Sequence, residues 1–366
     1  MAAGRHPRVV ALLLLAAAAL SACSGSTAPA AEQPLERGAV AASHPLARQI
    51  GQRVLDEGGN AVDAAVAVHF ALAVCFPNAG NIGGGGFMLI HLPDGSIEAL
   101  DYRETAPAGA SEKLFQAADG RVVPGLSLHS HLAAGVPGSV RGLWEVHRRH
   151  GSRPWAEMLA PAIELAERGF EIDAWTAESL ERARKSFTGL PEAYRRVNNF
   201  ADYFTVGQGE VLRQPELAET LRRIAAEGPA GFYEGRTARL IVEEMRRGGG
   251  LITLDDLAGY EARWRPPVEG RFRDRRVVSM PPPSSGGIAL IEMLNMLEHF
   301  PVQRWHSASQ VHLVAEIEKR VFADRAALMG DPDFYPVPVA GLIDEAYAAE
   351  RAAVIDLERK SDPRSI

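Results

Sequence analysis

The segment Asn81-Ile-Gly-Gly-Gly-Gly-Phe-Met-Leu-Ile-His-Leu-Pro-Asp-Gly-Ser-Ile-Glu-Ala-Leu-Asp101 carries the clearest indication of the fold. Residues 87–91 and 97–101 are short, mainly apolar runs, and the Pro-Asp-Gly-Ser sequence between them is typical of a turn. They predict two strands joined by that turn. The preceding glycines do not form a phosphate loop, because no Lys-Ser or Lys-Thr follows and no Gly-x-Gly-x-x-Gly opens a helix. Such glycines suit close approach of the backbone to another strand or to a ligand.

Helical patterns flank this strand pair. Leu46, Ile50 and Val54 recur at helical spacing, with a proline in the first turn and Gly58-Gly59 at the end. Asn60 is a good N-cap for residues 61–74, which are apolar on nearly every side and should be buried. The other expected elements are helices 155–168, 215–227, 288–299 and 307–329, and a strand at 271–280. Helices around paired strands predict a layered α+β protein.

Arg103 is the sharpest candidate for a binding residue. It follows the strand at 97–101 and lies near the glycine run in sequence, where its guanidinium can offer two parallel donors to a carboxylate. An ion pair with Asp101 or Glu104 is the alternative. Ser284 and Ser285 precede a helix, so they can cap it or contact an anion at its N-terminus.

The sequence gives little indication of a metal site or of a serine nucleophile. No Cys/His cluster has zinc spacing, and Asp331 and Asp333 suit a turn better than a calcium loop. Ser139 is not in a Gly-x-Ser-x-Gly elbow. His69 and Cys75 lie in apolar runs and are expected in the core. The sequence therefore predicts no metal and no cofactor.

The N-terminus predicts export. Arg5 and Arg8 precede the apolar residues 9–20, and Leu20-Ser-Ala-Cys23 resembles the lipobox of bacterial lipoproteins. We expect a signal peptide at 1–22, lipidation of Cys23, a tether at 23–38 and one domain at 39–366. The chain would then lie on the periplasmic side of a bacterial membrane, or in the periplasm or outside the cell if it is not lipidated.

Composition sets further limits. The net charge of −7 is unsuited to nucleic acid, so no nucleic-acid partner is expected. Of the two cysteines, only Cys75 follows Cys23, which leaves no internal disulfide. No segment after residue 22 is apolar for long enough to cross a bilayer.

Several motifs together resemble the large subunit of bacterial γ-glutamyltranspeptidases, also called glutathione hydrolases. They occur in that family's order and span roughly residues 39–340. The motifs are Gly58-Gly-Asn-Ala-Val-Asp-Ala-Ala65, Gly80-Asn-Ile-Gly-Gly-Gly-Gly-Phe-Met-Leu-Ile90, Asp101-Tyr-Arg-Glu-Thr-Ala-Pro107, Gly135-Val-Pro-Gly138, Met280-Pro-Pro-Pro-Ser-Ser-Gly-Gly-Ile288, Ala323-Asp-Arg325 and Gly330-Asp-Pro-Asp-Phe334.

The resemblance implies an N-terminal-nucleophile hydrolase with an αββα sandwich. Such a proenzyme cuts itself before a threonine, which then attacks γ-glutamyl amides such as glutathione. Arg103 matches the family arginine that binds the substrate α-carboxylate. The nucleophile belongs to the small subunit and is expected beyond Ile366, so no catalytic residue is expected in this chain. The chain alone should be inactive and should need a small subunit from the same precursor or a separate gene.

Two alternatives stay open at this point. One is an amidase of the same fold, similar to cephalosporin acylases. The other is a non-catalytic lipoprotein that keeps the large-subunit fold for binding. The motif at 101–107 favours the γ-glutamyl enzyme over the acylase, because a glutamyl α-carboxylate needs a fixed guanidinium.

Overall fold

The computed structural model describes residues 38–301, 304 and 306–366, and Val40–Ile366 form one compact unit. The expected signal peptide, Cys23 and all but the last residue of the expected tether lie outside the described residues. Within the described part, no helix is both long and apolar enough to cross a membrane.

The first two helices form where the sequence predicts them. Helix α2 spans Pro45–Asp56, and its N-cap is His44, whose Nδ1 accepts the N–H of Leu46. Helix α3 spans Ala61–Cys75, and Asn60 caps it by accepting the N–H groups of Val62 and Asp63. Ten of its fifteen residues are buried, as its uniformly apolar sequence predicts.

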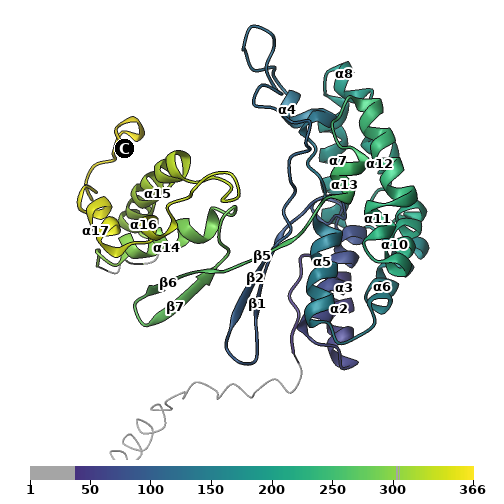
Figure 1. Ribbon diagram of the computed structural model, residues 1–366, viewed down its shortest axis with the longest axis horizontal. Helices are drawn as coiled ribbons and strands as arrows, with labels where there is room; N and C mark the ends of the chain where they lie inside the picture. The colour runs from purple at the N-terminus through teal and green to yellow at the C-terminus, as the bar shows by residue number, and fades with distance from the viewer. Residues whose placement is uncertain (1–37, 302–303, 305) are drawn as a thin grey trace, which may run out of the picture. The chain divides into compact units, whose positions relative to one another are not determined.

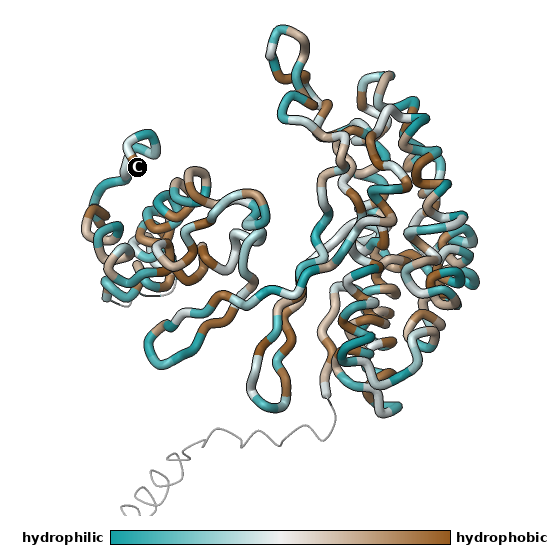
Figure 2. Tube along the Cα trace, in the orientation of Figure 1, coloured by the Kyte–Doolittle hydropathy of each residue, from teal (hydrophilic) through white to brown (hydrophobic). Residues whose placement is uncertain are grey.

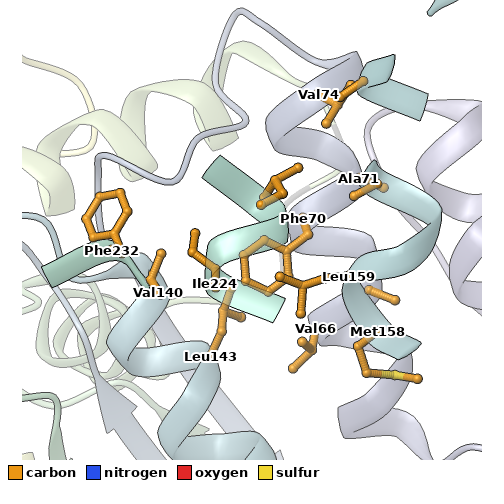
Figure 3. Packing of buried hydrophobic residues seen from close by; sticks show 14 of the residues in the cluster. Val66, Phe70, Ala71, Val74, Val140, Leu143, Met158, Leu159, Ile224 and Phe232 are labelled. Carbon is orange, nitrogen blue, oxygen red and sulfur yellow. The ribbon is translucent and has the colours of Figure 1, made fainter. Parts of the chain in front are cut away.

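The main core is a bundle of helices around α3. Helix α3 packs against α2, α5 (Ser139–His150) and α6 (Trp155–Arg168), while α10 (Pro215–Glu227) packs against α6 and α11 (Ala230–Tyr233) packs against α10. Figure 3 shows Phe70 of α3 among Leu143, Leu159 and Ile224, which come from three different helices. The ring of Phe70 meets that of Trp155 edge-on at 5.6 Å, and Trp155 Nε1 donates to the Ile224 carbonyl.

The central sheet has three antiparallel strands in the order β1 (Phe87–His91), β2 (Ile97–Asp101) and β5 (Arg263–Arg265). The hairpin of β1 and β2 is the predicted one, and its hydrophilic tip contrasts with its hydrophobic strands (Figures 1 and 2). Strand β5 was not predicted, because three residues of which two are arginines carry no strand pattern. Its register places Arg263 opposite Asp101.

The expected single strand at 271–280 is wrong. The structure has a hairpin of β6 (Val268–Phe272) and β7 (Arg275–Ser279), with Arg273 in the turn at φ 53°. Helix α14 (Gly286–Leu297) packs on this hairpin, and Gly270 leaves room there for Ile291. Helices α15 (Ala308–Leu328), α16 (Val339–Leu342) and α17 (Glu345–Ala353) complete this part.

The remaining elements surround the main core. They are α4 (Leu126–His129), η2 (His131–Ala133), β3 (Phe170–Glu171) paired with β4 (Val211–Leu212), α7 (Ala174–Thr188), α8 (Glu192–Arg195), α9 (Phe200–Tyr203), α12 (Gly235–Gly248) and α13 (Leu254–Ala258). The last element, η3 (Pro363–Ser365), follows Ser361, whose hydroxyl accepts a hydrogen bond from Arg320 of α15.

A buried carboxylate joins the helices of the main core. Asp63, at the start of α3, is fully buried and accepts the backbone N–H groups of Asn60, Ser152 and Arg153 and the hydroxyl of Ser152. His147 Nε2 lies 3.6 Å from its Oδ1. Burial alone raises the pKa of Asp63, but the hydrogen bonds outweigh it and hold the pKa below its usual value.

We expect Asp63→Asn to lower the free energy of unfolding by about 1–3 kcal/mol at pH 7, because buried N–H donors lose a charged acceptor. A lowered folded-state pKa means that the carboxylate's contribution is complete above about pH 5 and fades as the pH falls below about 4. Urea unfolding at pH 7 and at pH 3.5 measures both effects.

The exposed Asp56→Asn is the matched control and should change the unfolding free energy by no more than about 0.5 kcal/mol. If Asp63→Asn is as stable as the parent at pH 7, or if its deficit does not shrink at acid pH, Asp63 does not hold these helices together through its charge.

Candidate functional site

A cavity of about 690 Å³ lies where the end of β2 meets β5 and the loops around α14 and α15. Its lining is strongly charged and includes four arginines and five carboxylates. The charged lining residues are Asp101, Arg103, Glu104, Glu261, Arg263, Arg265, Arg325, Asp331 and Asp333.

Arg265 is the ion-pair partner of Asp101. The Nε of Arg265 donates to Asp101 Oδ2 at 2.8 Å, while Asp101 Oδ1 accepts the backbone N–H of Arg103 at 3.0 Å. The same guanidinium makes two parallel bonds to Asp333, at 3.2 and 2.7 Å, and Arg263 approaches Asp333 at 2.9 Å. The hydrogen bonds from Arg265 are the main reason why the pKa of Asp333 is lowered.

This pairing leaves the side chain of Arg103 uncommitted. Its guanidinium has no hydrogen bond or ion pair with another residue in the described part of the chain, and its Cζ lies 6.0 Å from the centre of the Phe87 ring. The expected alternative, a surface ion pair with Asp101 or Glu104, is therefore wrong. Arg103 presents an exposed, unpaired guanidinium at the cavity.

Two contacts hold the backbone around Arg103. Tyr260, which is only 4% exposed, donates its hydroxyl hydrogen to the Arg103 carbonyl at 2.8 Å. Gly85 lies so close to this segment that an added Cβ would be 2.5 Å from the Tyr102 carbonyl oxygen. The glycine run thus serves close backbone approach, as the sequence suggests.

Tyr260 is held in turn by a second glycine motif. A Cβ on Gly138 would lie 2.0 Å from the Tyr102 carbonyl oxygen and 2.2 Å from the Tyr260 hydroxyl. Tyr260 also stacks on Tyr233, whose hydroxyl donates to the Pro137 carbonyl. Burial raises the pKa of Tyr260 far above its usual value, so its hydroxyl stays protonated and able to donate.

The structure brings several predicted residues together. Arg103, Ser285, Asp331 and Asp333 all line the cavity, and both aspartates lie in a turn, as expected. Cys75 is a buried free thiol with a pKa raised by burial to about 12, and burial lowers the pKa of His69. No group of His, Cys, Asp and Glu in the described ranges is arranged to hold a metal ion.

The sequence did not reveal three other residues of the cavity. Tyr260, Arg265 and Arg325 lie in the cavity but were not singled out as site residues. Tyr260 carries no recognisable signal, because its hydrogen bond joins residues 157 positions apart. The pair of arginines in β5 is a weak signal, since a short charged segment normally indicates an exposed loop.

Comparisons with known proteins agree on one family. Residues 47–365 match the family model of gamma-glutamyltranspeptidase. The chain is 47% identical over 346 residues to a glutathione hydrolase proenzyme of Pseudomonas aeruginosa, covering 92% of this chain and 60% of that protein. It is 41% identical over 374 residues to the glutathione hydrolase proenzyme of Escherichia coli, covering 98% and 63%. The chain therefore spans about three fifths of the length of these relatives.

Solved structures give the same result. The gamma-glutamyltranspeptidase of Helicobacter pylori superposes with a TM-score of 0.85 at 43% identity, covering 90% of this chain and 95% of that chain. A cephalosporin acylase from Bacillus halodurans superposes with a TM-score of 0.78 at 30% identity, covering 89% and 62%. These matches confirm the expected α+β fold class, that of the N-terminal-nucleophile hydrolases.

We expect Gly138→Ala to destabilise the chain by about 1–3 kcal/mol, because the new methyl group would overlap the Tyr102 carbonyl and the Tyr260 hydroxyl. Urea denaturation followed by tryptophan fluorescence measures the change.

Gly83→Ala is the matched control in the neighbouring glycine run. Gly83 is exposed and a Cβ there would meet nothing within 4 Å, so the stability should stay within about 0.5 kcal/mol. Equal effects of the two substitutions would contradict the close packing proposed for the 138 position.

Proposed function

Because the chain belongs to the gamma-glutamyltranspeptidase family, we propose that residues 39–366 are the large-subunit portion of a γ-glutamyl-transferring enzyme. The enzyme would transfer the γ-glutamyl group of glutathione and other γ-glutamyl amides to water or to amino acids. The observation that supports this most directly is the unpaired guanidinium of Arg103 at the charged cavity.

Arg103 suits the α-carboxylate of a γ-glutamyl donor. A planar guanidinium binds a carboxylate through two parallel hydrogen bonds, and no acid in the described part of the chain is paired with Arg103. Because Tyr260 and Gly85 already hold the Arg103 backbone in place, less conformational entropy is lost when a ligand binds. Three carboxylates of the cavity, Glu104, Glu261 and Asp331, add negative charge that suits the substrate ammonium group.

The bond-breaking step would use a threonine outside this sequence. Its hydroxyl oxygen attacks the γ-carbonyl carbon, and its own α-amine accepts the proton. The amide C–N bond breaks, the amine leaves with that proton, and a γ-glutamyl ester of threonine forms. Water or the amino group of an acceptor then attacks the ester and restores the threonine hydroxyl. In this proposal, residues 39–366 bind the donor and are inactive without the small subunit.

An acylase of the same fold is the second candidate. Acylase ACY 1 proenzymes of Pseudomonas are 38% identical to the chain over about nine tenths of its length. The free Arg103 favours the γ-glutamyl enzyme, because it offers a site for an α-carboxylate at a fixed position. A third candidate is a lipoprotein that binds such compounds without turnover.

In the assembled enzyme, Arg103→Ala should erase most of the preference for donors that carry an α-carboxylate. Losing a hydrogen bond to a charged group costs about 1.5–3 kcal/mol, which corresponds to roughly 10- to 150-fold in kcat/KM. Arg103→Lys should recover only part of the preference, because it lacks the planar fork. The measurement compares γ-glutamyl anilide with its analogue lacking the α-carboxylate.

Two controls accompany this comparison. Arg275→Ala removes an exposed arginine outside the cavity and should leave the preference unchanged. Residues 39–366 by themselves should release no aniline. An Arg103→Ala enzyme that keeps the full preference would refute the binding role, and turnover by the isolated chain would refute the need for a small subunit.

We also propose that the protein is exported and anchored through a lipid on Cys23, on the basis of Leu20-Ser-Ala-Cys23. A lipid chain contributes about 0.8 kcal/mol per buried methylene, so its loss should weaken membrane attachment decisively. Cys23→Ala should therefore move the protein from the membrane to the soluble periplasmic fraction in cell fractionation. An unchanged membrane fraction, or a mature N-terminus other than residue 23 in the parent, would contradict the anchor.

A further inference from the structure

A second arginine faces the same cavity and also lacks an acidic partner. Arg325 lies near the end of α15, and its Nε donates to the hydroxyl oxygen of Ser285 at 2.9 Å. Its Cζ lies 5.9 Å from the centre of the Phe322 ring. No carboxylate among residues 38–301, 304 and 306–366 is paired with it, and its side chain is exposed. One edge of the guanidinium is thus fixed by Ser285, while its terminal nitrogens stay available.

Some charged residues of the cavity are paired with one another, and others, including Glu104, Glu261 and Asp331, form no ion pair in the described part of the chain. Asp101 and Asp333 are neutralised by Arg265 and Arg263. The arginines that remain for a ligand are Arg103 and Arg325, and they belong to parts of the chain more than 200 residues apart in sequence. A ligand with one carboxylate would engage only one of them, whereas a ligand with two would engage both.

A chain of hydrogen bonds and ion pairs connects the segment that carries Arg103 with the turn that follows α15, the helix that carries Arg325. Asp101 fixes the backbone N–H of Arg103 and accepts from Arg265, which in turn binds Asp333 in the turn that follows α15. On α15 itself, the neighbour of Arg325 is Asp324, which is 8% exposed and accepts two hydrogen bonds from Arg351 of α17. Each arginine therefore adjoins an aspartate that is already paired, which fixes its place while leaving its own guanidinium free.

The surroundings of Arg325 differ from those of Arg103. Pro283, Ala326, Met329 and Phe334 line the cavity on the α14 and α15 side, and Phe334 is 89% exposed. A carboxylate there would meet a guanidinium and a serine hydroxyl beside apolar surface. This combination suits the C-terminal end of a short peptide that carries an apolar or thiol side chain.

We propose that Arg325 and Ser285 form a second carboxylate subsite, which binds the free carboxylate of the peptide or amino acid on the amine side of the scissile amide. In a donor such as glutathione, this is the carboxylate of the terminal glycine. The proposal rests on the proposed function and extends it, because it makes compounds with carboxylates at both ends the preferred donors.

The test compares a γ-glutamyl dipeptide that has a free C-terminal carboxylate with the same compound as its C-terminal amide. The assembled parent enzyme should prefer the acid by about tenfold or more in kcat/KM. Arg325→Ala should bring this ratio close to one, chiefly by slowing the acid. Ser285→Ala should lower the ratio by a smaller factor. Because the readout is a ratio within one variant, a partial loss of folded enzyme does not affect it.

Two matched variants separate this subsite from the first. Arg103→Ala should slow both donors and leave their ratio unchanged, and Arg275→Ala should change neither donor. A parent ratio near one, or an Arg325→Ala ratio equal to the parent's, overturns the second subsite. The latter result would make Arg325 a structural residue that pairs with a carboxylate of the remaining polypeptide.

A binding experiment keeps the subsite separate from the γ-glutamyl assignment. If the assembled parent turns over no γ-glutamyl donor, the proposed function fails, and glycylglycine and glycylglycine amide are then titrated calorimetrically against that same assembled protein. Tighter binding of the acid that disappears in Arg325→Ala supports the subsite alone. Equal binding of acid and amide, or no binding of either, overturns it.

Discussion

The site depends on the ion pair between the Asp101 carboxylate and the Arg265 guanidinium. Asp101 is 7% exposed, and burying an unpaired carboxylate is costly, so it must be neutralised where β2 ends. Arg265 of β5 does this while also binding Asp333, which joins the sheet to the turn after α15. Removing Arg265 would leave Asp101 without a charged partner and Asp333 with Arg263 alone. The neutralisation of Asp101 at the end of β2 therefore depends on one guanidinium, which also links β5 to that turn.

This arrangement has a chemical consequence for the cavity. If Asp101 were paired with Arg103, the cavity would lose its exposed cation at the strand end and would have little affinity for an anion there. Because Arg265 takes the carboxylate, Asp101 binds only the backbone of Arg103 and orients the residue without neutralising it. Farther along the cavity, Ser285 plays a related role by holding Arg325 through one nitrogen. Neutral or backbone contacts orient both arginines, and their charge remains available to a ligand.

The sequence predicted the parts of the fold that local patterns determine. The capped helices α2 and α3, the periodic helices α6 and α10, and the β1–β2 hairpin were all found, because their signals lie within about fifteen residues. It missed β5 and divided the β6–β7 region wrongly, because Arg263-Trp-Arg265 lacks alternation and Arg273-Asp274 is not a typical turn pair. Arg103, which lines the cavity, was singled out by its motif and strand-end position. That its guanidinium is unpaired was not predicted, since the choice between Arg103 and Arg265 as the partner of Asp101 is made by contacts across 164 positions.

The glycines help to hold the Arg103 backbone in place, and an unpaired arginine binds a ligand well only if its backbone does not move. Gly85 and Gly138 let two segments pack directly on the Tyr102 and Arg103 backbone, closer than any side chain would permit. Tyr260 then fills the remaining space and satisfies the Arg103 carbonyl. The ordering of the site is thus achieved during folding, and a ligand that binds Arg103 has only the side-chain rotamers left to order. The same close packing explains why these motifs, far apart in sequence, act as one unit: each removes a side chain or supplies a hydrogen bond at the same strand end.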